Sequence, residues 1–472
     1  MKARYLLISL LASFMLFGAH SRRGPDVDMH WQLRLGQMIL ERGQLVTVDP
    51  FSFATTGRRL PTLSWLAQAN AALLYQLGSW ELVKIVDSLL FVGALVIVSF
   101  SRWLQNVRIF AVLVAMSLSY VIMLPHNSVR PQTYAFFCFA VLLWLLTSDL
   151  GDWTKLLGCA ATLLLWQNLH ASNTVAAFLL VPLFLSQAVL WWRGQAPGFP
   201  RVELGALVIL AGSQFATPEG FGLQQVQWTT ARLATMRGAT EWFPLWHPGL
   251  QDFAWPFWVG LVGSIVLLVR LQFRVSLPEF ALFLMMTAMG IAVCRLSVFA
   301  ALGLLPVWAR WLERALSPEW FAWRDLPEFS WPTTVAISVG SAALALAASW
   351  SLRPDFYAHH LPLPGIEALK RRLPEGRIVA ETGWCGPLLF HGPPGWKVWM
   401  DNRLYLFTDD EWRFFEEVMA GRVPVRQIEE RVHPDAFFLD PKIDLGLIEL
   451  LKADANWECI FADHRSVVFV RR

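Results

Sequence analysis

Residues 132–148 read QTYAFFCFAVLLWLLTS, an apolar run that contains no charged side chain. As a helix, a run of this length crosses most of a bilayer, whose hydrocarbon core takes about 20 apolar residues. A helix also satisfies its own backbone hydrogen bonds, which a segment inside lipid requires. The stretch therefore predicts a membrane-spanning helix.

Similar runs follow one another along the first three quarters of the chain. Apolar residues make up 55% of the 472 residues and charged residues only 16%, whereas a soluble domain carries about a quarter charged residues. Tryptophan, with 25 copies, suits the membrane–water interface. We predict about eleven spanning helices, near residues 5–20, 82–101, 108–124, 132–148, 156–170, 173–192, 203–217, 255–272, 279–294, 297–311 and 333–351.

The first of these runs also has the look of a signal peptide, because Lys2 and Arg4 precede it. However, Ala19-His20-Ser21 is a poor match to the small residues of a cleavage site. We therefore expect the run to be an uncleaved first helix.

Basic residues favour one set of alternate short loops. The short loops of one side hold only Arg130, Arg232, Arg237 and Arg295, and the long loop at 21–81 on that side is basic too, but long loops obey the rule weakly. The loops of the other side hold Arg102, Arg108, Lys155, Arg193, Arg201, Arg270, Arg274, Arg310, Arg314 and Arg324. Cytoplasmic loops of membrane proteins carry the excess of positive residues, so we predict a cytoplasmic N-terminus and an extracytoplasmic tail. The net charge of +3 is small, and without a basic stripe no nucleic-acid partner is expected.

The tail, residues 352–472, has a different pattern from the spanning region, residues 1–351. Short apolar runs alternate with helical stretches, which predicts a small α/β domain with a partly parallel sheet. The expected strands lie near 377–380, 397–400, 436–439 and 466–470, and the expected helices near 365–373, 409–420 and 443–453. Cys385 and Cys459 lie in this domain and would be able to form a disulfide in an oxidising compartment.

Two carboxylates, Asp26 and Asp28, follow the first helix directly, at the start of a long loop over residues 21–81. Such a pair near the membrane surface can supply a general base or hold a divalent cation. An ordinary hydrated loop is the alternative. Apolar positions from Leu33 to Leu40 predict a short amphipathic helix on the membrane surface, which Gly43 ends.

The run Asp28-Met29-His30-Trp31-Gln32-Leu33-Arg34-Leu35-Gly36 resembles the D-x-W-W-H-L-R-x-G stretch of a bacterial membrane family. That family belongs to the glycosyltransferase type C superfamily, near the proteins with oligosaccharyl- or mannosyl-transferase-like membrane domains. Gln32 replaces the family's His, and His30 is the candidate substitute; Thr217 replaces the usual Asn before Pro-x-G. Further matches, in the same order along the chain, are Asp49-Pro50-Phe51-Ser52-Phe53, Trp65-Leu66, Arg130-Pro131-Gln132, Asn168-Leu169-His170-Ala171-Ser172, Pro218-Glu219-Gly220, Glu241-Trp242-Phe243-Pro244, the Arg295 region and Val398-Trp399-Met400-Asp401-Asn402-Arg403.

The resemblance implies a type C fold in a bacterial inner membrane and a polyprenyl-phosphate-linked sugar as donor. It also implies transfer on the outer face, with an acidic residue just after the first helix as catalytic base. Asp28 occupies that place, and Asp26 is its neighbour. A base is needed because an acceptor hydroxyl is a poor nucleophile until it loses its proton.

The departing lipid phosphate needs cationic or hydrogen-bonding partners. Arg130, His170 and Arg295 lie at outer helix ends and are our candidates. Each has a plainer interpretation: Arg130 as a ligand of lipid headgroups, His170 as a buried histidine, and Arg295 as one half of an ion pair. Further candidates for the acceptor or substrate are Glu241, Glu219, His30, Asp401 and Arg403, of which Asp401 and Arg403 would equally make an ordinary fold-holding pair.

Three other functions are alternatives to this one. A transporter would carry charges along several spans, whereas here the polar residues gather on one face. A non-catalytic assembly factor for envelope polysaccharide would share the fold without needing Asp28. An outer-face glycan ligase or polymerase would use arginine and histidine without a carboxylate so close to the first helix.

Overall fold

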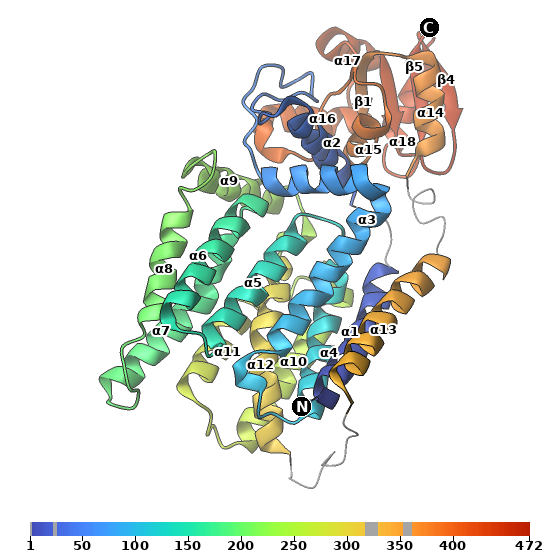
Figure 1. Cartoon of the computed structure of the whole chain (residues 1–472). Coiled ribbons are helices and arrows are strands. Elements are labelled where there is room, and N and C mark those ends of the chain that lie inside the picture. The colour runs from blue at the N-terminus through green and yellow to red at the C-terminus, as the bar shows by residue number, and fades with distance from the viewer. Residues whose placement is uncertain (1, 22–25, 317–328, 353–360) are drawn as a thin grey trace.

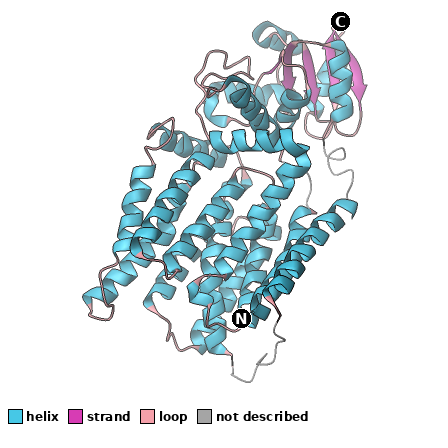
Figure 2. Ribbon diagram, viewed as in Figure 1, coloured by secondary structure: helices cyan, strands magenta, loops and turns pink. Residues whose placement is uncertain are grey.

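The computed structural model describes residues 2–21, 26–316, 329–352 and 361–472. It shows a bundle of helices with a smaller domain, which contains the β-sheet, at one end (Figures 1 and 2). We call the end of the bundle that faces this sheet domain the domain end and the opposite end the basic end. The predicted loop residue Arg324 and the junction at 353–360 lie outside the described residues.

Each of the eleven apolar runs coincides with a helix of the bundle. Among the residues described, seven helices are long and apolar enough to cross a membrane, four of them together with an adjoining 3-10 turn. These are α1 (Lys2–His20), α3 (Trp65–Ser99) and α13 (Trp331–Leu352), α4 (Ile109–Met123) with the turn after it, and α7 (Ala177–Trp192), α10 (Gln251–Arg270) and α12 (Ser297–Ala315), each with the turn before it. Two shorter apolar helices are α5 (Gln132–Thr147) and α11 (Leu277–Ala292), and α6 (Asp152–Leu169) and α8 (Arg201–Ser213) are less apolar. The count of eleven spans therefore stays a prediction for these last four.

Helix α12 runs through the middle of the bundle and packs against α4 and α11. Its Phe299 and Trp311 side chains are buried, and Phe299 stacks on Trp166 of α6 at 5.9 Å between ring centroids. At the edge of the bundle, α13 packs along α1, where the Ser13 and Ser341 hydroxyls are 2.8 Å apart (Figure 1).

The basic end is held together by arginines. Arg4 donates to the carbonyl oxygens of residues 104, 105 and 107 around the 3-10 helix η1 (Arg102–Leu104). Arg108 pairs with Glu313 at 2.9 Å. Arg310 and Arg314 both pair with the buried Glu279. The basic loops predicted to be cytoplasmic therefore contact one another at this end.

The segment between α1 and the second half of α3 is more ordered than a loop. The predicted amphipathic helix is α2 (Val27–Arg42), and Gly43 ends it with φ 62°. The expectation that it lies on the membrane surface is wrong. Its Met29 and Leu33 pack with the first half of α3, while Leu35 and Met38 join the core of the sheet domain. Both faces are covered by protein.

Helix α3 begins at Trp65, well before the predicted span. Gly78 and Ser79 interrupt it with non-helical backbone angles. In Figure 1 the part before this kink lies across the domain end of the bundle, and the part after it runs down through the bundle. Only the second part corresponds to the span predicted at 82–101.

The sheet domain has five strands in the order β2-β1-β3-β5-β4. The first three are parallel, and β5 is antiparallel to β3 and β4, so the predicted partly parallel α/β sheet is confirmed. The strands are β1 (Gly376–Ala380), β2 (Trp396–Val398), β3 (Ala436–Leu439), β4 (Trp457–Ala462) and β5 (Val467–Arg471). The helices are α14 (Leu363–Arg372), α15 (Thr382–His391), α16 (Asp409–Met419), α17 (Val425–Val432) and α18 (Leu445–Ala453).

The core of the sheet domain includes residues from far earlier in the chain. Val46, Phe51 and Leu60 pack into it, and Ser52 pairs with Val398 at the edge strand β2. Residues 46–60 therefore complete the core of a domain that the sequence pattern predicts within residues 352–472 alone. All five cysteines are free, and Cys385 is buried whereas Cys459 is exposed.

Candidate active site

The first turn of α2 positions two carboxylates at the domain end. Asp26 is the N-cap, and its Oδ1 accepts the Asp28 backbone N–H at 3.0 Å, which satisfies one of the free amides of a helix start. Asp28 Oδ1 accepts from Trp31 Nε1 at 3.3 Å and from Asn402 Nδ2 at 3.2 Å. Asp28 is therefore held by its own helix and by the sheet domain.

Two arginines and a third carboxylate lie beside this pair. The third carboxylate is Glu241, in the 3-10 helix η4 (Thr240–Trp242). Arg130, just before α5, donates to Asp26 at 2.5 Å and to Glu241 Oε2 at 3.2 Å. Arg295, in the 3-10 helix η6 (Cys294–Leu296), donates to Glu241 Oε1 at 3.2 Å. We call Asp26, Asp28, Arg130, Glu241 and Arg295 the carboxylate–arginine cluster.

The two arginines of the cluster are bonded to its carboxylates, and one buried N–H is left over. Burial opposes it, but the Arg295 and Arg130 guanidiniums hold the pKa of Glu241 below its usual value. Among the residues that the structure describes, the buried Arg130 Nε–H has no acceptor. A buried donor without a partner costs about 1–3 kcal/mol. An anion that accepted from Arg130 would remove that cost.

Asp28 is the carboxylate of the cluster with the chemistry of a base. Burial, with a further contribution from the Asp26 carboxylate, raises the pKa of Asp28 to about 6. Catalytic bases work best when their pKa lies near the operating pH, and such perturbed groups gather at functional sites. Asp28 is thus suited to take a proton near neutral pH.

The structure brings together five of the residues singled out from the sequence, namely the cluster itself. His170 lies within electrostatic range of Arg295 and Arg130 and bonds to the Ser172 hydroxyl at 2.7 Å. Sequence reasoning did not single out His126, whose Nε2 is 3.2 Å from the Ser297 hydroxyl. The available signal was its position at the outer end of the span predicted at 108–124.

Other predicted residues lie outside the cluster. Glu219 accepts from Arg59 at 2.7 Å and from the Thr62 backbone at 3.0 Å. His30 is buried, its ring lies 4.9 Å from that of Trp80, and burial lowers the pKa of His30 to about 3.

Arg403 is fully buried between two carboxylates. It pairs with Asp49 at 2.5 Å and with Asp401 at 2.6 Å, and the side chains of all three have 0–1% of their area exposed. This is the arrangement of the fold-holding pair that the sequence left open, with Asp49 as a third member. A substrate-binding role for Asp401 and Arg403 stays a prediction.

The donor set does not favour a divalent cation at Asp26 and Asp28. Asp26 already accepts from Arg130 and from the Asp28 backbone. In the described part of the chain, no group of three or more His, Cys, Asp or Glu side chains is placed to hold a metal ion. We therefore derive no chemical step through a metal.

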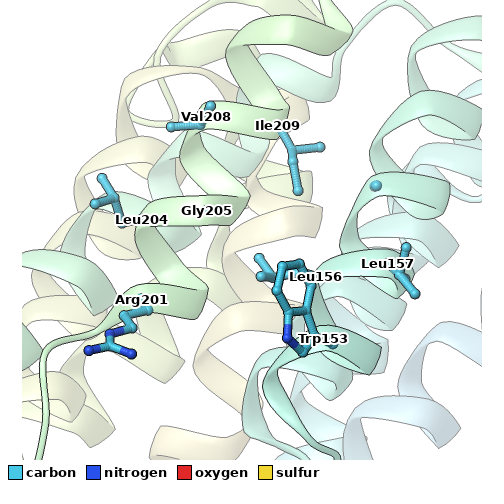
Figure 3. Close-up of a pocket in the computed structure, with 9 residues that line it drawn as sticks. Trp153, Leu156, Leu157, Arg201, Leu204, Gly205, Val208 and Ile209 are labelled. Atoms are coloured by element: carbon cyan, nitrogen blue, oxygen red, sulfur yellow. The ribbon is translucent and has the colours of Figure 1, made fainter.

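A separate groove of about 500 Å³ lies between α6 and α8 on the outside of the bundle (Figure 3). Its lining is apolar apart from Arg201, and Trp153 and Arg201 come from the starts of their helices. It shares no residue with the cluster.

No family model matches the sequence, and no curated protein matches it. Solved structures do match the fold. ArnT from Cupriavidus metallidurans, bound to undecaprenyl phosphate, is 14% identical with a TM-score of 0.55, over 98% of this chain and 97% of that one. The archaeal oligosaccharyltransferase AglB from Archaeoglobus fulgidus, in complex with an inhibitory peptide and a dolichol-phosphate, is 12% identical with a TM-score of 0.52, over 99% of this chain and 74% of that one. Both are type C glycosyltransferases.

This chain has the glycosyltransferase type C fold. The similarity covers both the helical bundle and the sheet domain, because it extends over nearly the whole chain. The resemblance of the sequence motifs to the type C superfamily is thereby confirmed at the level of the fold. At 12–14% identity, the likeness concerns the fold and leaves the reaction to be argued from the residues of this chain.

Proposed function

We propose that this protein is an integral membrane glycosyltransferase. It transfers a sugar from a polyprenyl-phosphate-linked donor to an acceptor at the domain end, and Asp28 is its general base. The type C fold supports this class of reaction. The observation that carries the proposal is the Asp28 carboxylate, with its raised pKa, two residues from Asp26, whose carboxylate pairs with Arg130.

In the proposed mechanism, Asp28 takes the proton of an acceptor hydroxyl, and the acceptor oxygen bonds to the anomeric carbon of the sugar. The bond from that carbon to the lipid phosphate breaks, and its electron pair stays on the phosphate oxygen. Arg130 and Arg295 stabilise the charge that develops there, as fixed donors do in a site shielded from water. Their bonds to Glu241 hold them in place beforehand.

Lipid analysis tests the reaction class. Cells that lack the protein should accumulate a polyprenyl-linked sugar, which mass spectrometry of lipid extracts detects, and the intact gene should remove it. The Arg295→Lys protein should transfer the sugar about 10²-fold more slowly than the unaltered protein. Lysine keeps the positive charge but cannot bond to Glu241 and Gln132 at the same time with two separate N–H groups, as Arg295 does.

Arg232→Lys is the matched control for this experiment. Arg232 is exposed on α9 (Gly222–Met236), so replacing it by lysine is the same chemical change made outside the cluster. It should restore the lipid profile fully. An unchanged lipid profile in the deletion strain contradicts the enzyme proposal and favours the assembly factor.

The orientation of the chain can be read with an impermeant thiol reagent. We expect intact cells to be labelled at Cys459, the exposed cysteine of the sheet domain. In a Cys459→Ser background, Gly249→Cys should be labelled and Gly194→Cys should not. Both glycines are exposed, and they lie in loops that the distribution of basic residues assigns to opposite sides. The reverse pattern would place the cluster in the cytoplasm.

The rate of transfer should rise with pH, since only the deprotonated Asp28 accepts a proton. With a pKa raised to about 6, the acidic limb should have its midpoint near that pH and fall about tenfold per unit below it. The charged groups that face Asp28 are Asp26 and Arg130, and its neutral titratable neighbours are the buried Cys385 and the partly buried Tyr405. Initial rates in membranes from the deletion strain, supplemented with purified protein, measure the limb. A flat profile between about pH 5 and 8 would contradict the assignment.

A further inference from the structure

The hydrogen bonds of Asp28 are unevenly divided between its two oxygens. Both donors, Trp31 Nε1 and Asn402 Nδ2, bond to Oδ1. Among the residues that the structure describes, no donor bonds to Oδ2. A carboxylate held by one oxygen has a fixed plane and presents the other oxygen in a fixed direction.

One of these two donors comes from the sheet domain. Trp31 lies on the same helix as Asp28, one turn further on, so it fixes the carboxylate relative to α2 only. Asn402 is 374 residues away in sequence and lies between β2 and the 3-10 helix η7 (Leu404–Leu406). It fixes the carboxylate relative to the sheet domain.

We propose that Asn402 is a positioning residue for the general base, and that its side-chain amide holds Oδ1 of Asp28 so that Oδ2 faces the acceptor. This inference rests on the proposed function. It gives the sheet domain a part in the reaction, because the domain supplies a contact to the reacting carboxylate.

The backbone around Asn402 is rigid enough for this task. Its neighbours Asp401 and Arg403 are buried and bonded to each other, and Arg403 is also bonded to Asp49. Asp49 in turn accepts from the backbone N–H groups of Phe51 and Ser52 at 3.1 and 3.3 Å. The exposed Asn402 side chain therefore extends from a stretch of backbone that buried ion pairs hold in place. An amide on a loop without such contacts would not hold its partner in one position.

The contact can be tested without any sugar substrate. In purified full-length protein, infrared difference spectra between the unaltered chain and Asp28→Asn identify the carboxyl band of Asp28. Its titration with pH gives the pH at which half of the Asp28 carboxyl groups are deprotonated, which we call the Asp28 midpoint. A hydrogen bond to the charged form favours that form. Asn402→Ala should therefore move the midpoint up by roughly one unit. Asn402→Asp, which has the same shape but adds a negative charge, should move it further.

Asn456→Asp is the matched control. Asn456 is exposed in the same domain, and its backbone carbonyl accepts a hydrogen bond from the Arg472 backbone N–H. The Asn456→Asp substitution should leave the Asp28 midpoint unchanged. Because Asn402 is exposed, its substitutions should leave the thermal unfolding midpoint of the protein unaltered.

The transfer assay separates the two proposals. An Asp28 midpoint that does not move in Asn402→Ala and Asn402→Asp overturns the positioning role, and leaves the proposed function standing if Asp28→Asn is inactive. Undiminished transfer by Asp28→Asn overturns the proposed function, and the catalytic purpose of Asn402 with it. Moved midpoints together with an inactive Asp28→Asn support both.

Discussion

Asp28→Asn should slow sugar transfer by about 10²–10⁴-fold, the usual contribution of a general base. The asparagine amide has the size of the carboxylate but cannot take the proton of the acceptor. The protein should still fold, because Asp28 is only partly buried and the helix cap made by Asp26 uses the backbone of residue 28 and not its side chain. Transfer in deletion-strain membranes, at matched protein amounts, gives the ratio.

Asp26→Asn separates the two carboxylates in the same assay. Asp26 pairs with Arg130 at 2.5 Å, so its loss should weaken the placement of that arginine and reduce the rate less than Asp28→Asn does. Full activity of Asp28→Asn would remove the base from the mechanism. The assembly-factor interpretation, which needs no carboxylate there, would then account for the protein.

Arg403→Met should cause the largest loss of stability of any single substitution that we consider. It leaves the Asp49 and Asp401 carboxylates buried without a cation, and removing one partner of a buried ion pair costs about 3–5 kcal/mol. The expected result is a lower thermal midpoint. In a Cys459→Ser background, which removes the exposed thiol, the reaction of a thiol-reactive dye with Cys385, buried in the same domain, reports the unfolding.

Two further variants make this test specific. The triple change Asp49→Asn, Asp401→Asn and Arg403→Met removes the uncompensated charges, so it should recover part of the loss. Arg426→Met breaks an exposed pair with Glu430 in the same domain and should barely change the midpoint, since exposed pairs contribute little. Equal losses in Arg403→Met and Arg426→Met would show that the buried triad does not hold the fold.

Much of the bundle follows from local patterns in the sequence. A long apolar run predicts a spanning helix. The spacing of apolar residues, and the glycine that ends it, predict α2. Two of the missed elements, β4 and α15, lack such patterns, whereas the missed helix α17 is short but carries buried Val425, Ile428 and Val432 at helical spacing. Strand β4 carries polar Glu458 within its sequence and lies at the sheet edge. Helix α15 contains two glycines and a proline, and at Gly386 a Cβ would lie 2.2 Å from the Val27 carbonyl oxygen of α2.

The cluster could be predicted in outline for a physical reason. Apolar spans confine polar side chains to the ends of helices, so a topology alone places Asp26, Arg130, Glu241 and Arg295 on one face. Which of them pair is a different matter. The Arg130–Asp26 contact joins residues 104 apart, and no local pattern encodes it.

Long-range contacts likewise explain what the sequence left open at the sheet domain. Asp401 and Arg403 are close in sequence, but Asp49, their third member, is 354 residues from Arg403. A pair of charges on a strand end is equally consistent with a surface site and with a buried core. Only the position of the loop at 46–60 decides that Arg403 is enclosed.

The contacts between the early loop and the sheet domain impose an order on biosynthesis. Asp49 leaves the ribosome long before Arg403, and 354 residues at about 5–20 residues per second take roughly 20–70 s. During that time the loop has no cation for its carboxylate and no sheet to join, while the helices in between enter the membrane. Asp28 likewise has no hydrogen bond from Asn402 until that residue has been synthesised. A chain that ends before Asn402 therefore lacks the donor that holds Asp28, and the proposed geometry of the base arises only after the sheet domain has been synthesised.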